Sequence, residues 1–452
     1  MSKSYQINMT EGNILPKIIK FSIPLMLSGM LQLFFNAADV IVVGRYAGDE
    51  ALAAVGSTGA LINLLINLFI GISIGASVLM GQAIGARDYN DAQDSLHTAM
   101  LTGLIGGIIM IFVGQVVSRP MLELMQTPDD VIELSSLYMK IYFMGMPGFM
   151  LYNFGAAILR AAGDTKRPLY YLFVSGIVNV ILNLYFVIVL KMSVDGVAYA
   201  TIISEAISAI LIVICLMRSD GYLNLSLRKL KIDGKKFIEM LKIGIPSGFT
   251  GIVFSVSNML IQSSINSFGK LVMAANTAAS NLEGFVYNAM NSIYQTALAF
   301  ASQNMGAKKL DRVDDVLKKS LLVVSGVGLF FGVGAYLLGE ILLRLYTPNQ
   351  EVIDIAMLRL LVISTSYFLC GIMDVYSGVI RGMGFSFTPM LVSMFFVCAF
   401  RVFWIYTIFE HFHEQWVLYI SYPVSWAITI IAYFFTYKIV RKKAKEKILK
   451  MS

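Results

Sequence analysis

Asp39 is an ionisable side chain within a long apolar run, and it is the residue of this chain with the clearest capacity for chemistry. It lies 15 residues beyond Pro24, and Gln32 and Asn36 precede it by seven and three residues. A helix would place these three polar side chains on one face. A carboxylate in such a setting can take up a proton or supply oxygen to a bare cation. The spacing predicts a cation-binding face, with a purely structural carboxyl group as the alternative, and Pro24 predicts a bend or a fixed kink in the same helix.

Two further apolar runs carry polar stripes at helical spacing. Ser175, Asn179 and Asn183 recur every four residues, and Thr201 is followed one turn later by Glu205. Single polar side chains in such runs often only join neighbouring helices, at about 1 kcal/mol each. Because both stripes belong to the same half of the chain as Asp39, we expect them to complete its site. Glu205 is a second candidate cation carrier, and a structural role for it is an equal alternative.

The second half of the chain also has polar side chains inside apolar runs, namely Asn258, Gln262, Glu283, Asp374 and Arg401. An unpaired arginine in lipid is expensive, so Arg401 is predicted to pair with Glu283 or Asp374. We interpret these five residues as cavity or lobe-fixing groups, with a buried ion pair favoured over substrate contact. Nothing resembles a metal motif, a phosphate-binding loop or a nucleophile–base pair, so the sequence predicts neither an enzyme nor a bound cofactor.

The elements that must position these groups are long apolar helices. The 452 residues are 57% hydrophobic and only 14% charged, which is too apolar for a soluble domain. Runs of about 20 apolar residues are long enough to span a membrane, and they lack the period-two alternation of barrel strands. The sequence predicts an all-α integral membrane protein whose twelve spans lie at roughly 18–43, 52–81, 95–117, 134–158, 168–190, 196–217, 240–267, 272–300, 317–338, 353–380, 388–409 and 416–437.

The chain repeats itself at an offset of about 221 residues. Gln82-Ala-Ile-Gly-Ala-Arg returns as Gln303-Asn-Met-Gly-Ala-Lys, and Leu159-Arg-Ala-Ala-Gly returns as Ile380-Arg-Gly-Met-Gly. Each half holds six spans, so the two six-helix bundles are parallel copies related by an internal pseudo-two-fold axis. The predicted domains are an N-terminal lobe at 1–217, a linker at 218–239, a C-terminal lobe at 240–437 and a basic tail at 438–452.

The net charge of +7 resides mainly in alternate loops, in the linker and in the tail. This asymmetry predicts a multi-pass protein of the cytoplasmic membrane with both termini in the cytoplasm. Its basic residues are therefore expected to face lipid headgroups, with no nucleic acid as partner. We expect a monomer.

Several motifs resemble those of the multidrug and toxic compound extrusion (MATE) transporters. They are the Pro24 helix, the run Phe35-Asn-Ala-Ala-Asp39 with Val43-Gly44, and the two repeated motifs described above. The resemblance covers essentially the whole chain. It implies a two-lobed antiporter that exports organic, often cationic, small molecules in exchange for H+ or Na+. The broader fold also includes flippases of lipid-linked sugars.

The resemblance further implies a cation site in the N-terminal lobe. In the family this site has an aspartate in the first span, an asparagine and an aspartate in the fifth, and a threonine in the sixth. The matching positions here are Asp39, Asn179, Asn183 and Thr201, so the second acid of the family is replaced by Asn183. Glu205 is the candidate to compensate for it. Another branch uses an acid in the seventh span, where this chain has Phe254.

These expectations combine into one function, the coupled export of organic compounds by alternating access. A flippase is the alternative within transport, although its cavity should hold several basic residues. An intramembrane enzyme is the alternative from another class, and it lacks any visible catalytic pair.

Overall fold

The computed structural model describes residues 5–125 and 127–450. The first residues of the predicted N-terminal lobe, 1–4, and the last two of the predicted tail, 451–452, lie outside the described residues, as does residue 126. The part that is described contains helices and no strands. Continuous apolar stretches form helices here because a helix pairs all of its backbone polar groups internally.

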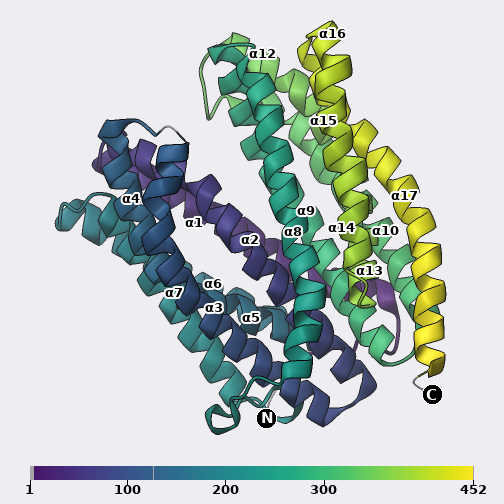
Figure 1. The fold of residues 1–452 in the computed structure, drawn as a ribbon. Coiled ribbons are helices and arrows are strands. Elements are labelled where there is room, and N and C mark those ends of the chain that lie inside the picture. Colours follow the sequence, from purple (N-terminus) through teal and green to yellow (C-terminus); the bar gives the residue numbers. More distant parts are fainter. Residues whose placement is uncertain (1–4, 126, 451–452) are drawn as a thin grey trace. The chain divides into compact units, whose positions relative to one another are not determined.

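The first half of the chain forms seven α-helices and three short helical segments of other types (Figure 1). They are α1 (Ile14–Tyr46), α2 (Asp49–Ala86), α3 (Tyr89–Leu124), α4 (Asp129–Met144), α5 (Met146–Ala161), α6 (Lys166–Leu184), η1 (Tyr185–Val189), α7 (Val194–Met217), η2 (Gly221–Leu223) and η3 (Leu227–Lys229).

The second half repeats this order with more interruptions. Its helices are α8 (Gly234–Asn266), α9 (Lys270–Gly306), α10 (Leu310–Leu337), α11 (Gly339–Leu343), α12 (Gln350–Arg359), η4 (Leu360–Ser364), α13 (Tyr367–Gly382), α14 (Phe387–Ser393), η5 (Met394–Ala399), α15 (Phe400–Trp404), η6 (Ile405–Phe409), α16 (Glu410–Phe412) and α17 (Gln415–Lys450). The segments η4, η5 and η6 are π-helical. The tenth and eleventh predicted spans are therefore helical over most of their length, but they are not regular α-helices.

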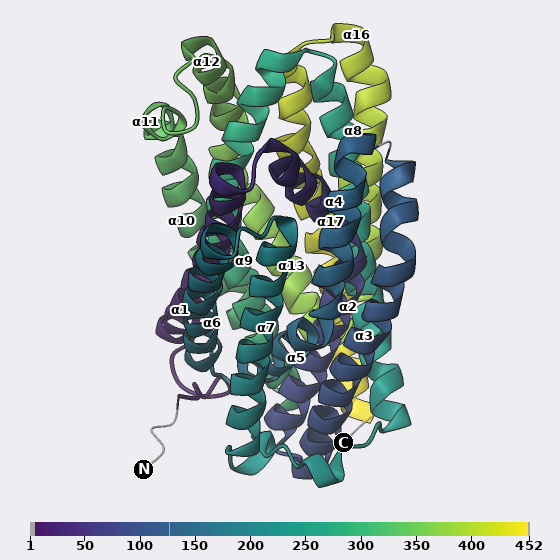
Figure 2. The same ribbon diagram turned by 90° about the vertical axis from the view of Figure 1, so that its left-hand side faces the viewer.

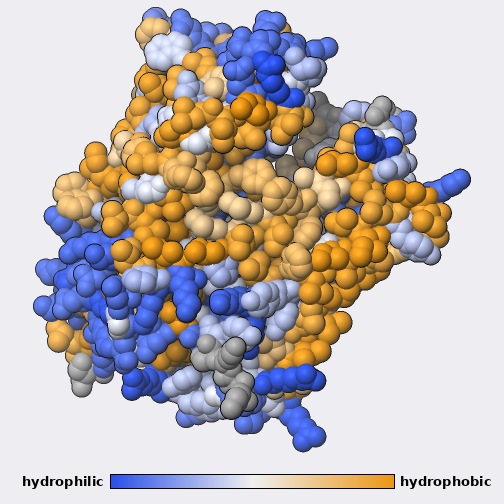
Figure 3. Space-filling model, turned by 180° about the vertical axis from the view of Figure 1, so that it is seen from behind, coloured by the Kyte–Doolittle hydropathy of each residue, from blue (hydrophilic) through white to orange (hydrophobic). Residues whose placement is uncertain are grey.

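Every predicted span coincides with helix in the structure. Within the described residues, ten helical stretches are long and apolar enough to cross a membrane, and α4 with α5 makes an eleventh if this pair, bent by 50° at Gly145, is one span. The remaining predicted span is α9, a helix of 37 residues with a more polar sequence. Apolar side chains cover much of the face shown in Figure 3, and hydrophilic residues gather toward its ends, as expected for a surface that contacts lipid.

The chain divides into two compact units, and each is described separately. The first consists of Leu27–Gly248 and the described residues up to Ile7, and the second consists of Asn8–Met26 and the chain from Phe249 onward. The boundaries therefore lie within α1 and α8, a few residues after Pro24 and Pro246 respectively. The start of α1 belongs to the second unit, and the start of α8 belongs to the first. The predicted domain boundaries at 217 and 240 describe the sequence halves and stay a prediction.

In the first unit, α3, α5 and α7 lie side by side, and the start of α8 packs closely on α2 (Figure 2). A Cβ atom on Gly71 of α2 would lie 2.2 Å from the backbone nitrogen of Gly248, and one on Gly75 would lie 2.3 Å from the carbonyl oxygen of Met240. Small residues at these positions let two helix backbones approach each other directly.

The linker between the halves is held against the start of α3. The Ser226 N–H donates to His97 Nε2 (3.2 Å), and the Asp233 N–H donates to Thr98 Oγ1 (3.0 Å). The Lys236 N–H donates to the Asp233 carboxylate at the start of α8 (2.9 Å), and this hydrogen bond lowers the pKa of Asp233.

In the second unit, residues 8–26 pack on α9 and α10. The Asn304 side chain donates to the Met9 carbonyl (3.1 Å), and the Arg312 guanidinium donates to the carbonyls of Glu11 and Gly12 (2.8 Å each). Ser22 and Thr296 are hydrogen-bonded at 2.8 Å. The core of this unit lies among α9, α10, α13 and α17.

Candidate functional site

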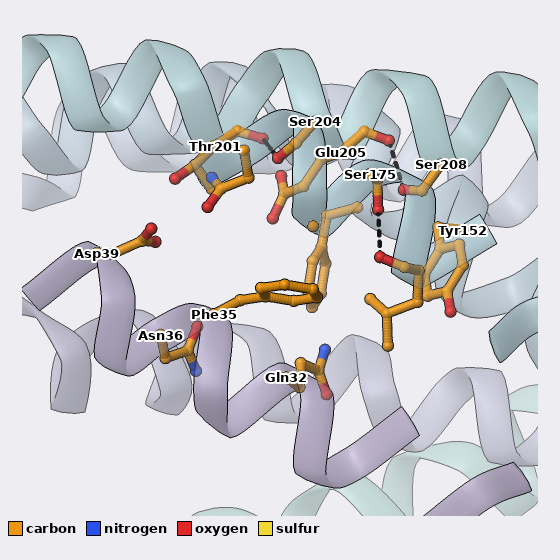
Figure 4. Close-up of a pocket in the computed structure, with 14 residues that line it drawn as sticks. Gln32, Phe35, Asn36, Asp39, Tyr152, Ser175, Thr201, Ser204, Glu205 and Ser208 are labelled. Carbon is orange, nitrogen blue, oxygen red and sulfur yellow. Dashed lines mark hydrogen bonds between the residues drawn. The ribbon is translucent and has the colours of Figure 1, made fainter. Parts of the chain in front are cut away.

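A polar pocket opens within the first unit between α1, α5, α6 and α7 (Figure 4). Of the 14 residues that line it, Asp39 and Glu205 are acidic and none is basic. The lining also includes amides, hydroxyls and three aromatic side chains, those of Phe35, Phe149 and Tyr152. Such a pocket combines negative charge with aromatic faces, which are the two features that attract organic cations.

The first polar stripe forms one wall of the pocket. Gln32, Asn36 and Asp39 all line it from α1, as their spacing predicts. The Asp39 side chain points away from α1 into the pocket (Figure 4). This helix contains Pro24, which is buried.

Asp39 is bound by an amide from α6. The Asn183 side chain donates one hydrogen bond to Asp39 Oδ1 and another to Asn179 Oδ1 (3.2 Å). Both asparagines are at least 95% buried, and the Asn183 Oδ1 atom has no hydrogen-bond partner within the described residues. The amide therefore donates one hydrogen bond to the Asp39 carboxyl group and holds it in place in the pocket.

The opposite wall is formed by α7. Four residues of this helix line the pocket: Thr201, Ser204, Glu205 and Ser208. The three hydroxyls among them donate to backbone carbonyls one turn earlier, as Ser208 does to Glu205 (2.8 Å) and Thr201 does to Val197 (3.0 Å). The lone pairs of these oxygens remain available as acceptors. The pocket thus gathers Asp39, Asn179, Thr201 and Glu205 from three helices, with Asn183 in contact with Asp39.

The C-half candidates lie in the second unit and form a different arrangement from the one predicted. The predicted pairing of Arg401 with Glu283 or Asp374 is wrong. Arg359 binds both oxygens of Glu283, at 3.0 and 2.7 Å, and it also donates to Asn276. Arg359, which was not among the candidates from the sequence, ends α12 and is only 5% exposed.

Arg401 is instead stabilised by aromatic rings. Its guanidinium lies 4.1 Å from the centroid of the Tyr422 ring, and its Nε donates to Ser425 (3.0 Å). The face of an aromatic ring attracts a cation, so that no carboxylate is required. Gln262 donates to Asn266 (2.9 Å) and accepts from Asn276 (3.0 Å), whereas Asn258 is exposed and Asp374 is partly buried.

Sequence reasoning missed the apolar part of the pocket and the role of Arg359. Phe35 was quoted only within a motif, and Phe149 and Tyr152 belong to a run whose aromatic residues have no distinctive spacing. Phe35 packs closely against Gly176 of α6, because a Cβ atom on Gly176 would collide with the Phe35 ring. That close approach depends on two helices far apart in the sequence, so no single run reveals it.

Both halves of the chain match the same known protein family. The family model MatE matches residues 24–185 and again residues 246–407. The chain belongs to the MATE family of transporters. The two matches begin 222 residues apart, in agreement with the predicted repeat.

Relatives of this MATE protein extend over nearly its whole length. "Probable multidrug resistance protein YoeA" of Bacillus subtilis is 29% identical over 432 residues, which cover 94% of this chain and 93% of the relative. "Multidrug export protein MepA" of Staphylococcus aureus is 21% identical over 374 residues, which cover 83% of each chain.

Solved structures have the same fold. A MOP superfamily transporter from Pyrococcus furiosus superposes with a TM-score of 0.91 at 21% identity, covering 98% of this chain and 99% of the other. The Vibrio cholerae MATE transporter VcmN in its bent form superposes with a TM-score of 0.86 at 22% identity, covering 95% and 97%. The twelve-helix, two-lobe fold of this MATE protein is thereby confirmed.

Proposed function

We propose that this MATE protein exports organic, cationic or amphiphilic compounds across the cytoplasmic membrane in exchange for H+ or Na+. The observation that carries the proposal is the pocket of the first unit, which has two acids, aromatic walls and no basic residue among its lining. The names of the relatives, which refer to multidrug resistance and export, support the same class of substrate.

Asp39 is the coupling residue in this proposal. A proton or a sodium ion neutralises Asp39, and an organic cation binds best when the site is charged, so the two compete. Each ligand binds one conformation of the transporter more tightly than the other. Competition between the two ligands therefore shifts the equilibrium between these conformations. The Asn183 amide holds the Asp39 carboxyl group in place through one hydrogen bond.

A flippase of lipid-linked sugars is less consistent with this pocket. A diphosphate headgroup requires basic partners, whereas the pocket contains two carboxyl groups. Arg401, a buried arginine of the second unit, lies against Tyr422.

The test is transport of ethidium, a flat aromatic monocation, by the purified protein in liposomes under separately imposed proton and sodium gradients. We expect one of the gradients to drive ethidium uphill in the wild type, and Asp39→Asn to abolish this response. Asp129→Asn, an exposed aspartate at the start of α4, is the matched control and should behave as the wild type.

Two outcomes would contradict the proposal. If neither gradient moved ethidium through the wild-type protein, coupled export of organic cations would be refuted. If Asp39→Asn retained the full response to the gradient, another residue would be the coupling site.

A further inference from the structure

Glu205 occupies the same pocket as Asp39 but faces it from another helix. It projects from α7, one turn after Thr201, and its carboxyl group points into the space that Asp39 enters from α1 (Figure 4). The pocket thus has one acid on each of two opposing walls. Asn183, the side chain that contacts Asp39 from α6, supplies only an amide.

The surroundings of Glu205 differ from those of a structural acid in the same chain. Glu283 is 3% exposed, and both of its oxygens are bound by Arg359. The Oε2 atom of Glu205 is also out of contact with solvent, but it has no hydrogen-bond partner within the described residues. A buried carboxyl group without a partner is stable only as the neutral acid or beside a bound cation. Among the described residues, Glu205 Oε2 therefore lacks the kind of contact that holds both oxygens of Glu283.

The backbone next to Glu205 is shaped around its carboxyl group. The fourth span breaks at Gly145 with a bend of 50°, and a Cβ atom at this position would lie 3.0 Å from Glu205 Oε2. Breaks in membrane helices recur at the binding sites of transporters, because they bring backbone polar groups to membrane depth. The glycine and the bend together leave room for this acid in the wall of the pocket.

We infer that Glu205 binds a second proton, so that one organic monocation is exchanged for two protons, one released by Asp39 and one by Glu205. This inference rests on the proposed function and specifies its stoichiometry. In each cycle the substrate displaces one proton from each carboxylic acid, and both acids are protonated again after the substrate leaves. The exchange moves one net positive charge opposite to the substrate, whereas exchange for a single proton would move none.

The experiment measures the response of ethidium exchange to membrane potential in liposomes that contain the purified protein, in sodium-free buffer with a fixed pH gradient. With one net charge per cycle, a potential of about 60 mV shifts the equilibrium ethidium ratio about tenfold. We expect this shift in the wild type and no shift in Glu205→Gln, in which the ethidium ratio should also respond less steeply to the pH gradient because only one proton is exchanged. Glu50→Gln, an exposed acid at the start of α2, is the control and should keep the tenfold shift.

A second measurement does not depend on turnover. Ethidium added to the purified protein in weakly buffered detergent solution should release two protons per bound molecule from the wild type and one from Glu205→Gln. Size-exclusion chromatography checks that the variant is folded. If Glu205→Gln released as many protons as the wild type, or kept the potential response, the assignment of Glu205 would be overturned.

The wild type alone separates this inference from the proposed function. Ethidium transport that responds to a pH gradient but not to potential would refute the second proton and leave antiport intact. Ethidium transport that responds only to a sodium gradient would also refute the second proton and leave antiport intact. The absence of a response to any gradient would refute the proposed function itself.

Discussion

At the scale of single residues, Arg359 and Glu283 form a buried ion pair in the second unit. Arg359 is held by two hydrogen bonds to one carboxylate and lies near the rings of Tyr419 and Tyr422, at 5.7 and 5.9 Å from their centroids. Removing one member of a buried pair leaves the other charge without compensation, and this costs much more than the pair contributes when it is intact.

Glu283→Gln should therefore destabilise the protein by about 3–5 kcal/mol, because the Arg359 cation would remain buried without its carboxylate. The measurement is thermal unfolding of the purified protein in detergent. Glu340→Gln removes a carboxylate from an exposed pair with Arg344, with both side chains more than half accessible, and should cost at most about 1 kcal/mol. Equal losses in the two variants would show that the buried pair is not a major source of stability.

The sequence predicts side chains that share a helix face better than it predicts contacts between helices. Gln32, Asn36 and Asp39 line one pocket because the helical period alone places them together. The partner of Arg401 depends on which helix lies opposite. A carboxylate was expected there, but the Arg401 guanidinium lies against the rings of Tyr422 and Trp426. Arg359 lies near the start of the predicted span 353–380, and its partner Glu283 belongs to another helix, so neither run alone indicates the pair.

At the scale of elements, glycine controls the contact of α2 with the start of α8. Gly71 and Gly75 lie one turn apart, and each faces backbone atoms of α8. Because a backbone cannot rotate away as a flexible side chain can, these positions have no room for a methyl group.

Gly71→Ala should lower stability by about 1–3 kcal/mol through overpacking, since its Cβ atom would lie 2.2 Å from a backbone nitrogen. Gly59→Ala in the same helix is the matched control, because no atom lies within 4 Å of a Cβ built there. The control should be neutral or slightly stabilising, since alanine favours a helix more than glycine does. Thermal unfolding of the two variants side by side is the measurement, and a stable Gly71→Ala variant would contradict the close contact.

Each of the twelve predicted spans coincides with helix in the structure, but most of the interruptions within them were not predicted. Apolar length determines where a helix can cross a membrane, and it requires no knowledge of neighbours. The break at Gly145 is marked in the sequence by Pro147 and Gly148, which were not used in the prediction, whereas the π-helical segments η4, η5 and η6 have no turn residues to mark them. Such irregularities arise from packing against other helices, which periodicity does not report.

At the scale of the whole molecule, the distribution of basic residues predicts its orientation in the membrane. Lys191 precedes α7 and Lys229 follows it, both side chains are exposed, and the 24 residues of this helix rise about 36 Å. These two lysines should therefore lie on opposite sides of the bilayer, with Lys229 in the cytoplasm.

Cysteine labelling in intact cells tests this orientation. Lys191→Cys should react with a membrane-impermeant maleimide from outside, and Lys229→Cys should react only after permeabilisation. The native Cys215, Cys370 and Cys398 are buried and should give little background. The reverse labelling pattern would refute the predicted orientation.

The exchange of half-helices between the two units has a consequence for the origin of the protein. Each repeat contributes the beginning of its first helix, up to a few residues beyond its proline, to the compact unit built mainly by the other repeat. A single ancestral repeat would have lacked this piece of its own core and would have obtained it from a second copy. The gene that was duplicated is therefore expected to have encoded an obligate, arm-exchanged homodimer, and fusion made permanent an association that the separate chains already required.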